Sequence, residues 1–197
     1  MNADTALLML DYQVALCEEG PLCRAAPLAA AVRERRVVTT ARRVLDAARE
    51  RGVAVYHVRL AFDPTFALRT NRLARFDAYV DGKAMIAGSP EAEFVADLAP
   101  NGGEPVVDKG CVDPFVGTPL RVALAADGIT HVVLGGVATN LVVESAARHA
   151  SDTGLRVSVV EDMCASFTAA AHDFATSTTL PLFGTVTTAD SIVRSWS

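Results

Sequence analysis

Short apolar runs alternate with amphipathic stretches along most of this chain. Continuous apolar runs of four to eight residues are typical of buried parallel strands, and apolar residues at helical spacing indicate helices packed on a sheet. We predict strands at residues 6–10, 53–58, 105–107, 131–134, 156–160 and 185–187, and helices at 37–51, 119–127, 140–153 and 168–178. This alternation predicts an α/β fold of βαβ units, with a parallel sheet between two layers of helices.

The stretch 61–103 departs from this pattern. It holds many residues that break regular structure, among them Pro64, Gly82, Pro90 and Pro100, and shows a short helical pattern only over 91–98. We expect it to be a long irregular connection. The chain of 197 residues has no linker composition, repeat or low-complexity tract, so we expect residues 1–197 to form a single domain.

Composition narrows the class of protein. A hydrophobic content of 51% with 6% aromatic residues suits a buried parallel sheet, and a net charge of −5 argues against nucleic-acid binding. No apolar stretch approaches the roughly 18 residues of a membrane span, and no basic segment followed by an apolar one suggests a signal peptide. The four cysteines form no C-x-x-C pair. We therefore expect a cytoplasmic protein without membrane or nucleic-acid partners.

Three polar sites follow directly on apolar strands. They are Asp11, Lys109 and the turn that begins at Gly135-Gly136. Ligands of open parallel sheets bind beyond the carboxyl ends of the strands, where such residues converge. From spacing alone, the aspartate serves equally well as a cap for the next segment, and a lone lysine is more often a surface residue.

The glycine turn carries the most information. An apolar run at 132–134 ends at Gly135-Gly136, and a helical pattern opens near Thr139-Asn140. A strand, a tight turn and a capped helix in this order present backbone N–H groups to an anion or an oxyanion. The sequence therefore predicts a donor-rich bend at the same sheet edge as Asp11 and Lys109.

Taken together, these segments resemble the isochorismatase-like hydrolases, also called the cysteine hydrolase family. Asp-Tyr-Gln at 11–13, Lys109, Phe-Val-Gly-Thr at 115–118 and Gly-Val-Ala-Thr at 136–139 occur in the family's order and spacing, and the resemblance runs from residue 6 to 188. It implies a three-layer α/β/α Rossmann-like fold with a six-stranded parallel sheet in the order 3-2-1-4-5-6. It also implies an Asp–Lys–Cys triad at the carboxyl edge of that sheet.

The resemblance assigns roles to individual residues. Asp11 corresponds to the acid/base and Lys109 to its charge partner, while Val137, Ala138 and Thr139 form the turn whose N–H groups make the oxyanion hole. In the family the peptide bond at the position of Val137–Ala138 is commonly cis, and we predict the same here.

The third triad position is occupied by Val142, which is not a nucleophile. Our main hypothesis is hydrolysis without a covalent cysteine intermediate, in which Asp11 is the general acid/base. The isochorismatases of this superfamily, which cleave a vinyl ether, also lack the cysteine. One alternative is a catalytically silent pseudo-enzyme or small-molecule binder that keeps the family pocket. A second is a C–N (amide or urea) hydrolase whose thiol is relocated, with Cys17 and Cys111 as candidates.

Substrate, cofactor and partner expectations complete this interpretation. Residues near the strand ends that we expect to contact a small-molecule substrate are Gln13, Leu16, Arg59, Phe62 and Phe115. Further arginines that could bind an anion are Arg69, Arg72 and Arg75. We expect no metal, because the histidines that form the metal site of related nicotinamidases are missing after the second strand. No dinucleotide fingerprint is present, so we expect no cofactor. The resemblance also implies self-association as a homodimer or tetramer.

Overall fold

A parallel sheet forms the centre of the molecule. The computed structural model describes residues 3–197. Six strands pair in the order β3-β2-β1-β4-β5-β6, and every neighbouring pair is parallel. The strands are β1 (Thr5–Leu10), β2 (Ala54–Leu60), β3 (Val106–Lys109), β4 (His131–Val137), β5 (Arg156–Ala165) and β6 (Thr185–Thr187). The predicted fold class and strand order are confirmed.

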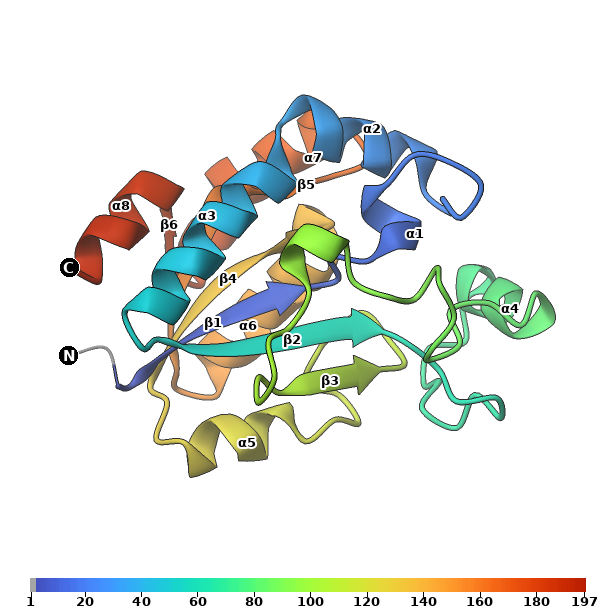
Figure 1. Cartoon of the computed structure of the whole chain (residues 1–197), viewed down its shortest axis with the longest axis horizontal. Coiled ribbons are helices and arrows are strands. Elements are labelled where there is room, and N and C mark those ends of the chain that lie inside the picture. The colour runs from blue at the N-terminus through green and yellow to red at the C-terminus, as the bar shows by residue number, and fades with distance from the viewer. Residues whose placement is uncertain (1–2) are drawn as a thin grey trace.

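Helices cover both faces of the sheet. Figure 1 shows α2, α3 and α8 on one face and α5 and α6 on the other. The α-helices are α1 (Val14–Cys17), α2 (Ala26–Glu34), α3 (Val37–Glu50), α4 (Ala74–Asp81), α5 (Leu120–Ala126), α6 (Glu144–Asp152), α7 (Ala169–Phe174) and α8 (Ala189–Ser195). Two π turns, η2 (Thr139–Val143) and η3 (Ala175–Thr179), and two 3₁₀ turns, η1 (Ala96–Leu98) and η4 (Leu180–Leu182), complete the chain. None of the helices formed by residues 3–197 has both the length and the apolar character that crossing a membrane requires.

Two apolar cores lie against the sheet, one on each face. Successive side chains of a strand point to opposite faces, so β1 sends Leu7 and Met9 into the core under α3, and Leu8 and Leu10 into the core over α6. The small side chains of α6, which are Ala146, Ala147 and Ala150, are fully buried in this second core. The alanine face of α6 therefore packs on its own sheet.

Four strands extend further than the sequence predicts. β2 continues to Leu60, β3 to Lys109, β4 to Val137 and β5 to Ala165, because backbone pairing continues past the apolar runs. Leu60 lies opposite Lys109 in β3, and Gly136 lies opposite Leu10 in β1. The carboxyl ends of β1, β2, β3 and β4 thus meet at one edge.

The helix predicted at 91–98 is wrong except for its last turn, η1 at Ala96–Leu98. This segment runs extended beside the start of α1: Gln13 forms an antiparallel bridge with Phe94, and the N–H of Val14 donates to Glu93 O at 2.9 Å. Tertiary pairing replaces helical hydrogen bonds here. The sequence also misses α1, α2, α4 and α8, and the two long predicted helices at 140–153 and 168–178 are interrupted by π turns at η2 and η3.

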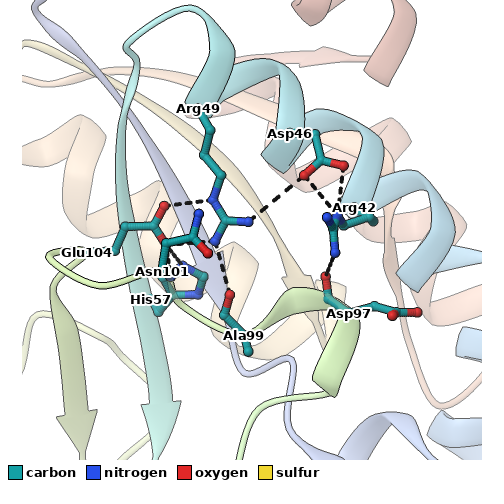
Figure 2. A network of polar contacts seen from close by, with 8 residues as sticks. All are labelled: Arg42, Asp46, Arg49, His57, Asp97, Ala99, Asn101 and Glu104. Carbon is teal, nitrogen blue, oxygen red and sulfur yellow. Dashed lines mark hydrogen bonds and ion pairs between the residues drawn. The ribbon is translucent and has the colours of Figure 1, made fainter.

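A network of polar contacts fixes α3 to the segment that precedes β3 (Figure 2). Arg49 donates to Glu104 through Nε and Nη2, both at 2.8 Å, and through Nη2 to Ala99 O at 3.0 Å. The N–H of Asn101 donates to Glu104 Oε2 at 2.8 Å, and His57 Nε2 of β2 lies 2.9 Å from the same oxygen. Both oxygens of Glu104 are therefore fully used in holding three segments together.

Candidate active site

Asp11 follows immediately on β1 and lies at the carboxyl edge of the sheet. Its backbone is in the left-handed region, with φ of +57°, and its N–H donates to Val58 O at 2.9 Å. Non-glycine residues adopt this region at a cost of about 1–2 kcal/mol, and such residues concentrate at functional sites. The side chain is buried, with Asp11 only 5% exposed. One carboxylate oxygen, Oδ1, has no hydrogen-bond partner among residues 3–197.

Lys109 is the last residue of β3 and is 1% exposed. Its Nζ lies 2.8 Å from Asp11 Oδ2 and donates to Cys111 O at 2.9 Å. Burial raises the pKa of the Asp11 carboxyl above its ordinary 3.8, although the charge of Lys109 opposes the shift. The two residues, distant in sequence, thus form a buried ion pair on the wall of one cavity.

The turn after β4 is held close to its neighbours. A Cβ on Gly136 would lie 2.4 Å from the backbone oxygen of Leu10, so only glycine fits there, and a Cβ on Gly135 would push against the end of the Met163 side chain at 2.7 Å and the Tyr12 hydroxyl at 2.9 Å. The peptide bond between Val137 and Ala138 is cis, as predicted. The bend therefore lies directly against the end of β1, beside Asp11.

Two side chains behind the turn hold the start of η2. Thr139 Oγ1 lies 2.8 Å from Nδ1 of His172 in α7, and Ser166 Oγ donates to the side chain of Asn140. Burial lowers the pKa of His172, which favours a neutral ring. Neither His172 nor Ser166 is among the predicted site residues, because an anchor behind a turn is not visible in local sequence spacing.

A cavity of about 330 Å³ opens beside the Asp11–Lys109 pair. It is lined mainly by apolar side chains from α1, α2, the ends of β2 and β4, and η2, including Leu16, Leu28, Leu60, Val137, Leu141 and Val142. Helix α4 forms another wall, and Figure 1 shows it beyond the arrowheads of β1, β2 and β3. A mostly apolar cavity with a few polar groups at this end of a parallel sheet has the properties of a small-molecule site.

The structure brings six of the predicted site residues to this cavity: Asp11, Lys109, Leu16, Val137, Ala138 and Val142. Thr139 lies in the turn, but its hydroxyl contacts His172 instead of lining the cavity. The remaining four predicted binding residues, Gln13, Arg59, Phe62 and Phe115, lie outside the lining.

Gln13 and Arg59 are held by other contacts. Gln13 is fully buried; its Nε2 donates to Leu60 O at 2.9 Å and Ala92 O at 2.8 Å, and its Oε1 accepts from the N–H of Leu60. The guanidinium of Arg59 forms ion pairs with Asp108 at 2.7 Å and Glu93 at 3.2 Å. Both side chains connect segments of the fold, so neither is free to bind a substrate.

The two predicted aromatic contacts pack elsewhere. Phe62 lies in a small core with Phe66 and Tyr79, at ring-centroid distances of 5.0 and 5.9 Å. Phe115 stacks on His149 of α6, with centroids 4.5 Å apart. Each ring is buried by a neighbour that the sequence pattern does not reveal.

Of the three further arginines that the sequence suggests for an anion, Arg75 lines the cavity and Arg69 and Arg72 do not, but the sequence pattern did not predict helix α4, which carries Arg75. Arg75, Phe76 and Tyr79 of this helix line the cavity, together with Arg24 and Phe167. The apolar residues at 76, 79 and 80 recur at helical spacing, which is the sequence signal that could have predicted helix α4. The surrounding glycines and prolines of 61–103 hide it.

Two thiols, those of Cys17 and Cys111, were also candidates for chemistry here. Cys17 Sγ lies 4.0 Å from the backbone oxygen of Asp11, and burial raises the pKa of its thiol far above the ordinary 9.0. Cys111 lines the cavity, but its Sγ is directed at the carbonyls of Asp113 and Val116, at 3.4 and 3.9 Å. Within residues 3–197, no three His, Cys, Asp or Glu side chains are grouped closely enough to hold a metal ion.

Comparison with known proteins agrees with this geometry. The family model described as "Isochorismatase domain" matches residues 5–191. A ureidoacrylate amidohydrolase, RutB, from Variovorax paradoxus is 28% identical over 208 residues, covering 99% of this chain and 82% of the relative. A maleamate amidohydrolase from Pseudomonas putida is 31% identical over 157 residues, covering 80% of this chain and 70% of the relative.

A solved structure shows the same fold. The crystal structure of a cysteine hydrolase from Pseudomonas syringae pv. phaseolicola superposes with a TM-score of 0.87 at 24% identity, covering 100% of this chain and 93% of the other. The family match spans both ends of the sheet and all segments that form the cavity. The chain therefore belongs to the isochorismatase family.

Proposed function

We propose that this protein is a hydrolase that acts on a small molecule in this cavity without a covalent cysteine intermediate. Asp11 is the general acid/base and Lys109 its charge partner. The observation that carries the proposal is the Asp11–Lys109 pair, which is buried on the wall of a cavity whose nucleophile position holds Val142.

Water is the nucleophile in this mechanism. The Asp11 carboxylate accepts a proton as the water oxygen attacks the carbonyl carbon of the substrate. The protonated carboxyl then gives that proton to the leaving nitrogen, and the C–N bond breaks to release an acid and an amine. The raised pKa makes Asp11 a stronger base than an exposed aspartate, while Lys109, 2.8 Å away, stabilises its charged form.

The turn after β4 supplies the electrostatic part of the reaction. Val137 and Ala138 line the cavity, and the first N–H groups of a helical turn have no carbonyl of the same turn behind them. Backbone donors around Val137, Ala138 and Thr139 would stabilise the oxyanion that develops on the carbonyl oxygen. The anchors from His172 and Ser166 keep this bend in place.

Two observations support C–N bonds as the target. The two curated relatives described above are named amidohydrolases, for ureidoacrylate and for maleamate. The buried pair also suits an amide, because an Asp11 carboxyl that has taken up a proton can donate it to the leaving nitrogen. Vinyl ethers are the alternative substrate class to be tested beside amides and ureas.

A relocated thiol is less well supported. The Cys17 thiol does not line the cavity, and burial raises its pKa, which disfavours the thiolate that a nucleophile requires. Cys111 reaches the cavity wall, but its sulfur is engaged with two backbone carbonyls. In the part of the chain that the structure describes, no hydrogen bond joins any thiol to the Asp11 carboxylate.

A silent binder is the second candidate, and Val142 favours it, because its side chain is 1% exposed and makes the position of the family nucleophile apolar. A screen separates the two functions. Amides, ureas and vinyl ethers are incubated with the wild-type protein and with Asp11→Asn, and products are followed by mass spectrometry. The proposal predicts a product that the variant forms at least about 100-fold more slowly. Binding without any product from the whole panel would contradict it and support the silent binder.

A further inference from the structure

The charged side chains that line the cavity are either paired or exposed to solvent. Lys109 pairs with Asp11 at 2.8 Å, so the two buried charges offset each other. Arg24 and Arg75 are exposed, and Arg24 also pairs with Glu91. Among the described residues, no buried cation without a carboxylate partner lines the cavity. The remaining lining residues are mostly apolar, and those that are at most 6% exposed include Leu28, Leu60, Phe76, Val137 and Val142.

Phe167 differs from the other apolar residues of this wall, because it is 42% exposed. It lies in the bend between β5 and α7, and both of its neighbours in the chain are fixed. The buried Ser166 donates to the side chain of Asn140, and Thr168 Oγ1 accepts the N–H of Ala171 at 3.2 Å, which caps α7. An anchored backbone therefore holds an aromatic ring at the cavity, although the protein itself does not bury that ring.

An apolar ligand would be favoured by such a wall. Covering apolar side chains with apolar atoms lowers the free energy roughly in proportion to the area removed from water. A carboxylate placed on the same wall would lose its hydration, and the one buried cation of the lining, Lys109, is already neutralised by Asp11. The polar end of a ligand is therefore best placed at the Asp11–Lys109 pair, with an uncharged apolar body on the rest of the wall.

We propose that the cavity selects neutral amides with an apolar body, and that Phe167 is a specificity-determining residue that packs on this body. The inference rests on the proposed function, since it places the amide group of the substrate at the Asp11–Lys109 pair. It adds the chemical character of the remainder of the substrate, which follows from the buried apolar wall and the exposed ring of Phe167.

Binding of a short series of amides tests the proposal without requiring turnover. Hexanamide is butanamide extended by two methylene groups, and adipamate is hexanamide with a carboxylate in place of its terminal methyl group. Each compound is titrated into the isotope-labelled wild type, Phe167→Ala and Phe174→Ala, and affinities are taken from chemical-shift changes in the NMR spectrum of the protein. Phe174 is the matched control, because it is an exposed phenylalanine at the end of α7 that does not line the cavity.

We expect the wild type and Phe174→Ala to bind hexanamide about tenfold more tightly than butanamide, as the burial of two methylene groups allows, and more tightly than adipamate. In Phe167→Ala the preference for hexanamide over butanamide should fall to about threefold or less, and Phe167→Leu should recover part of it. Phe167 is exposed, so these variants are expected to fold.

Four results would overturn the inference: equal affinity of the wild type for butanamide and hexanamide, tighter binding of adipamate, no binding of any of the three, or a chain-length preference that Phe167→Ala keeps in full. A chain-length preference without turnover of any compound in the hydrolysis screen would contradict only the proposed function. Turnover without a chain-length preference would contradict only this inference.

Discussion

Two carboxylates of this protein, the partly exposed Glu104 and the buried Asp11, differ in how many of their oxygens have hydrogen-bond partners. Glu104 receives two hydrogen bonds from Arg49, one from the N–H of Asn101 and a contact from His57, so both of its oxygens are occupied (Figure 2). Asp11 receives Lys109 on one oxygen, and its other oxygen has no partner within residues 3–197. Glu104 lies before β3 begins, and Lys109 ends the same strand.

The surroundings move the two pKa values in opposite directions. Burial raises the pKa of Glu104, but the hydrogen bonds from Arg49, Asn101 and His57 outweigh it and lower the pKa to about 2. For Asp11, burial outweighs the lowering contributions of Lys109 and of the backbone at Leu60, and the pKa is raised. A carboxylate with a lowered pKa holds segments together as an anion, whereas one with a raised pKa on the wall of a cavity is suited to proton transfer.

Substitutions of Asp11 and Glu104 should differ most in their effect on catalysis. We expect Asp11→Asn to reduce kcat/KM for the best substrate by at least about 100-fold, because the amide cannot accept and return a proton. Glu104→Gln should change it by less than about twofold at a temperature where both proteins are folded. A comparable loss of kcat/KM in the two variants would show that Asp11 and Glu104 do not differ in their role in catalysis.

A cysteine at position 142, where the resemblance places the family nucleophile, should raise activity at the Asp11–Lys109 pair. Val142 lines the cavity, and Val142→Cys would place a thiol beside the Asp11–Lys109 pair. We expect amide hydrolysis to increase by about tenfold or more, with an acyl-enzyme detectable by intact mass. Val143→Cys is the matched control, since Val143 is buried in the core over α6 and does not line the cavity. An equal gain in amide hydrolysis in both variants would argue against position 142 as the place of the nucleophile.

Glu104, which has little effect on catalysis, should contribute strongly to the stability of the fold. Glu104 is 15% exposed at its side chain and accepts several charge-assisted hydrogen bonds, so Glu104→Gln should lower the free energy of unfolding by about 1–3 kcal/mol at neutral pH. Glu93→Gln removes a more exposed partner of Arg59 and should cost less than about 1 kcal/mol. Urea titration measures both.

The stabilising effect of Glu104 should also depend on pH with a definite sign. Its folded-state pKa is lowered from 4.5 to about 2, so its contribution is present above 4.5 and is lost as the pH falls toward 2. The stability difference between wild type and Glu104→Gln should shrink over that range. A difference that is constant from neutral pH to pH 2 would contradict the role assigned to Glu104.

The smallest effects are expected from the thiols. Cys17→Ser and Cys111→Ser should each change the hydrolysis rate by less than about threefold, because neither sulfur acts on the substrate in this mechanism. Steady-state assays with both variants check this. Loss of activity in Cys111→Ser alone would favour a relocated nucleophile.

The sheet and the central pair could be predicted because they follow from local signals. Apolar runs mark β1, β3 and β4, and the polar residue at each carboxyl end must lie at one edge of a parallel sheet. The resemblance supplied the strand order and the turn. The meeting of Asp11 with Lys109 therefore needed no knowledge of the other side chains.

The cavity walls could not be predicted in the same way. Arg59 lies near the carboxyl end of β2 and Gln13 shortly after β1, close to Asp11 in position, yet Asp108 and Glu93 already pair with Arg59 and the backbone of Leu60 already bonds Gln13. Conversely, Arg75 reaches the cavity from a helix hidden among glycines and prolines. Which polar group is satisfied depends on contacts between distant segments, and sequence spacing does not encode them.

The pH dependence of kcat/KM tests the central claim most directly, because it reports the protonation of the catalytic group in the free enzyme. The mechanism needs Asp11 ionised, so the rate should fall as the pH drops through its folded-state pKa. Since burial raises that pKa, the midpoint of the acidic limb should lie above 3.8. A rate that does not change between pH 4 and 8, or a limb in the thiol range that disappears in a cysteine variant, would contradict the assignment of Asp11 as the acid/base.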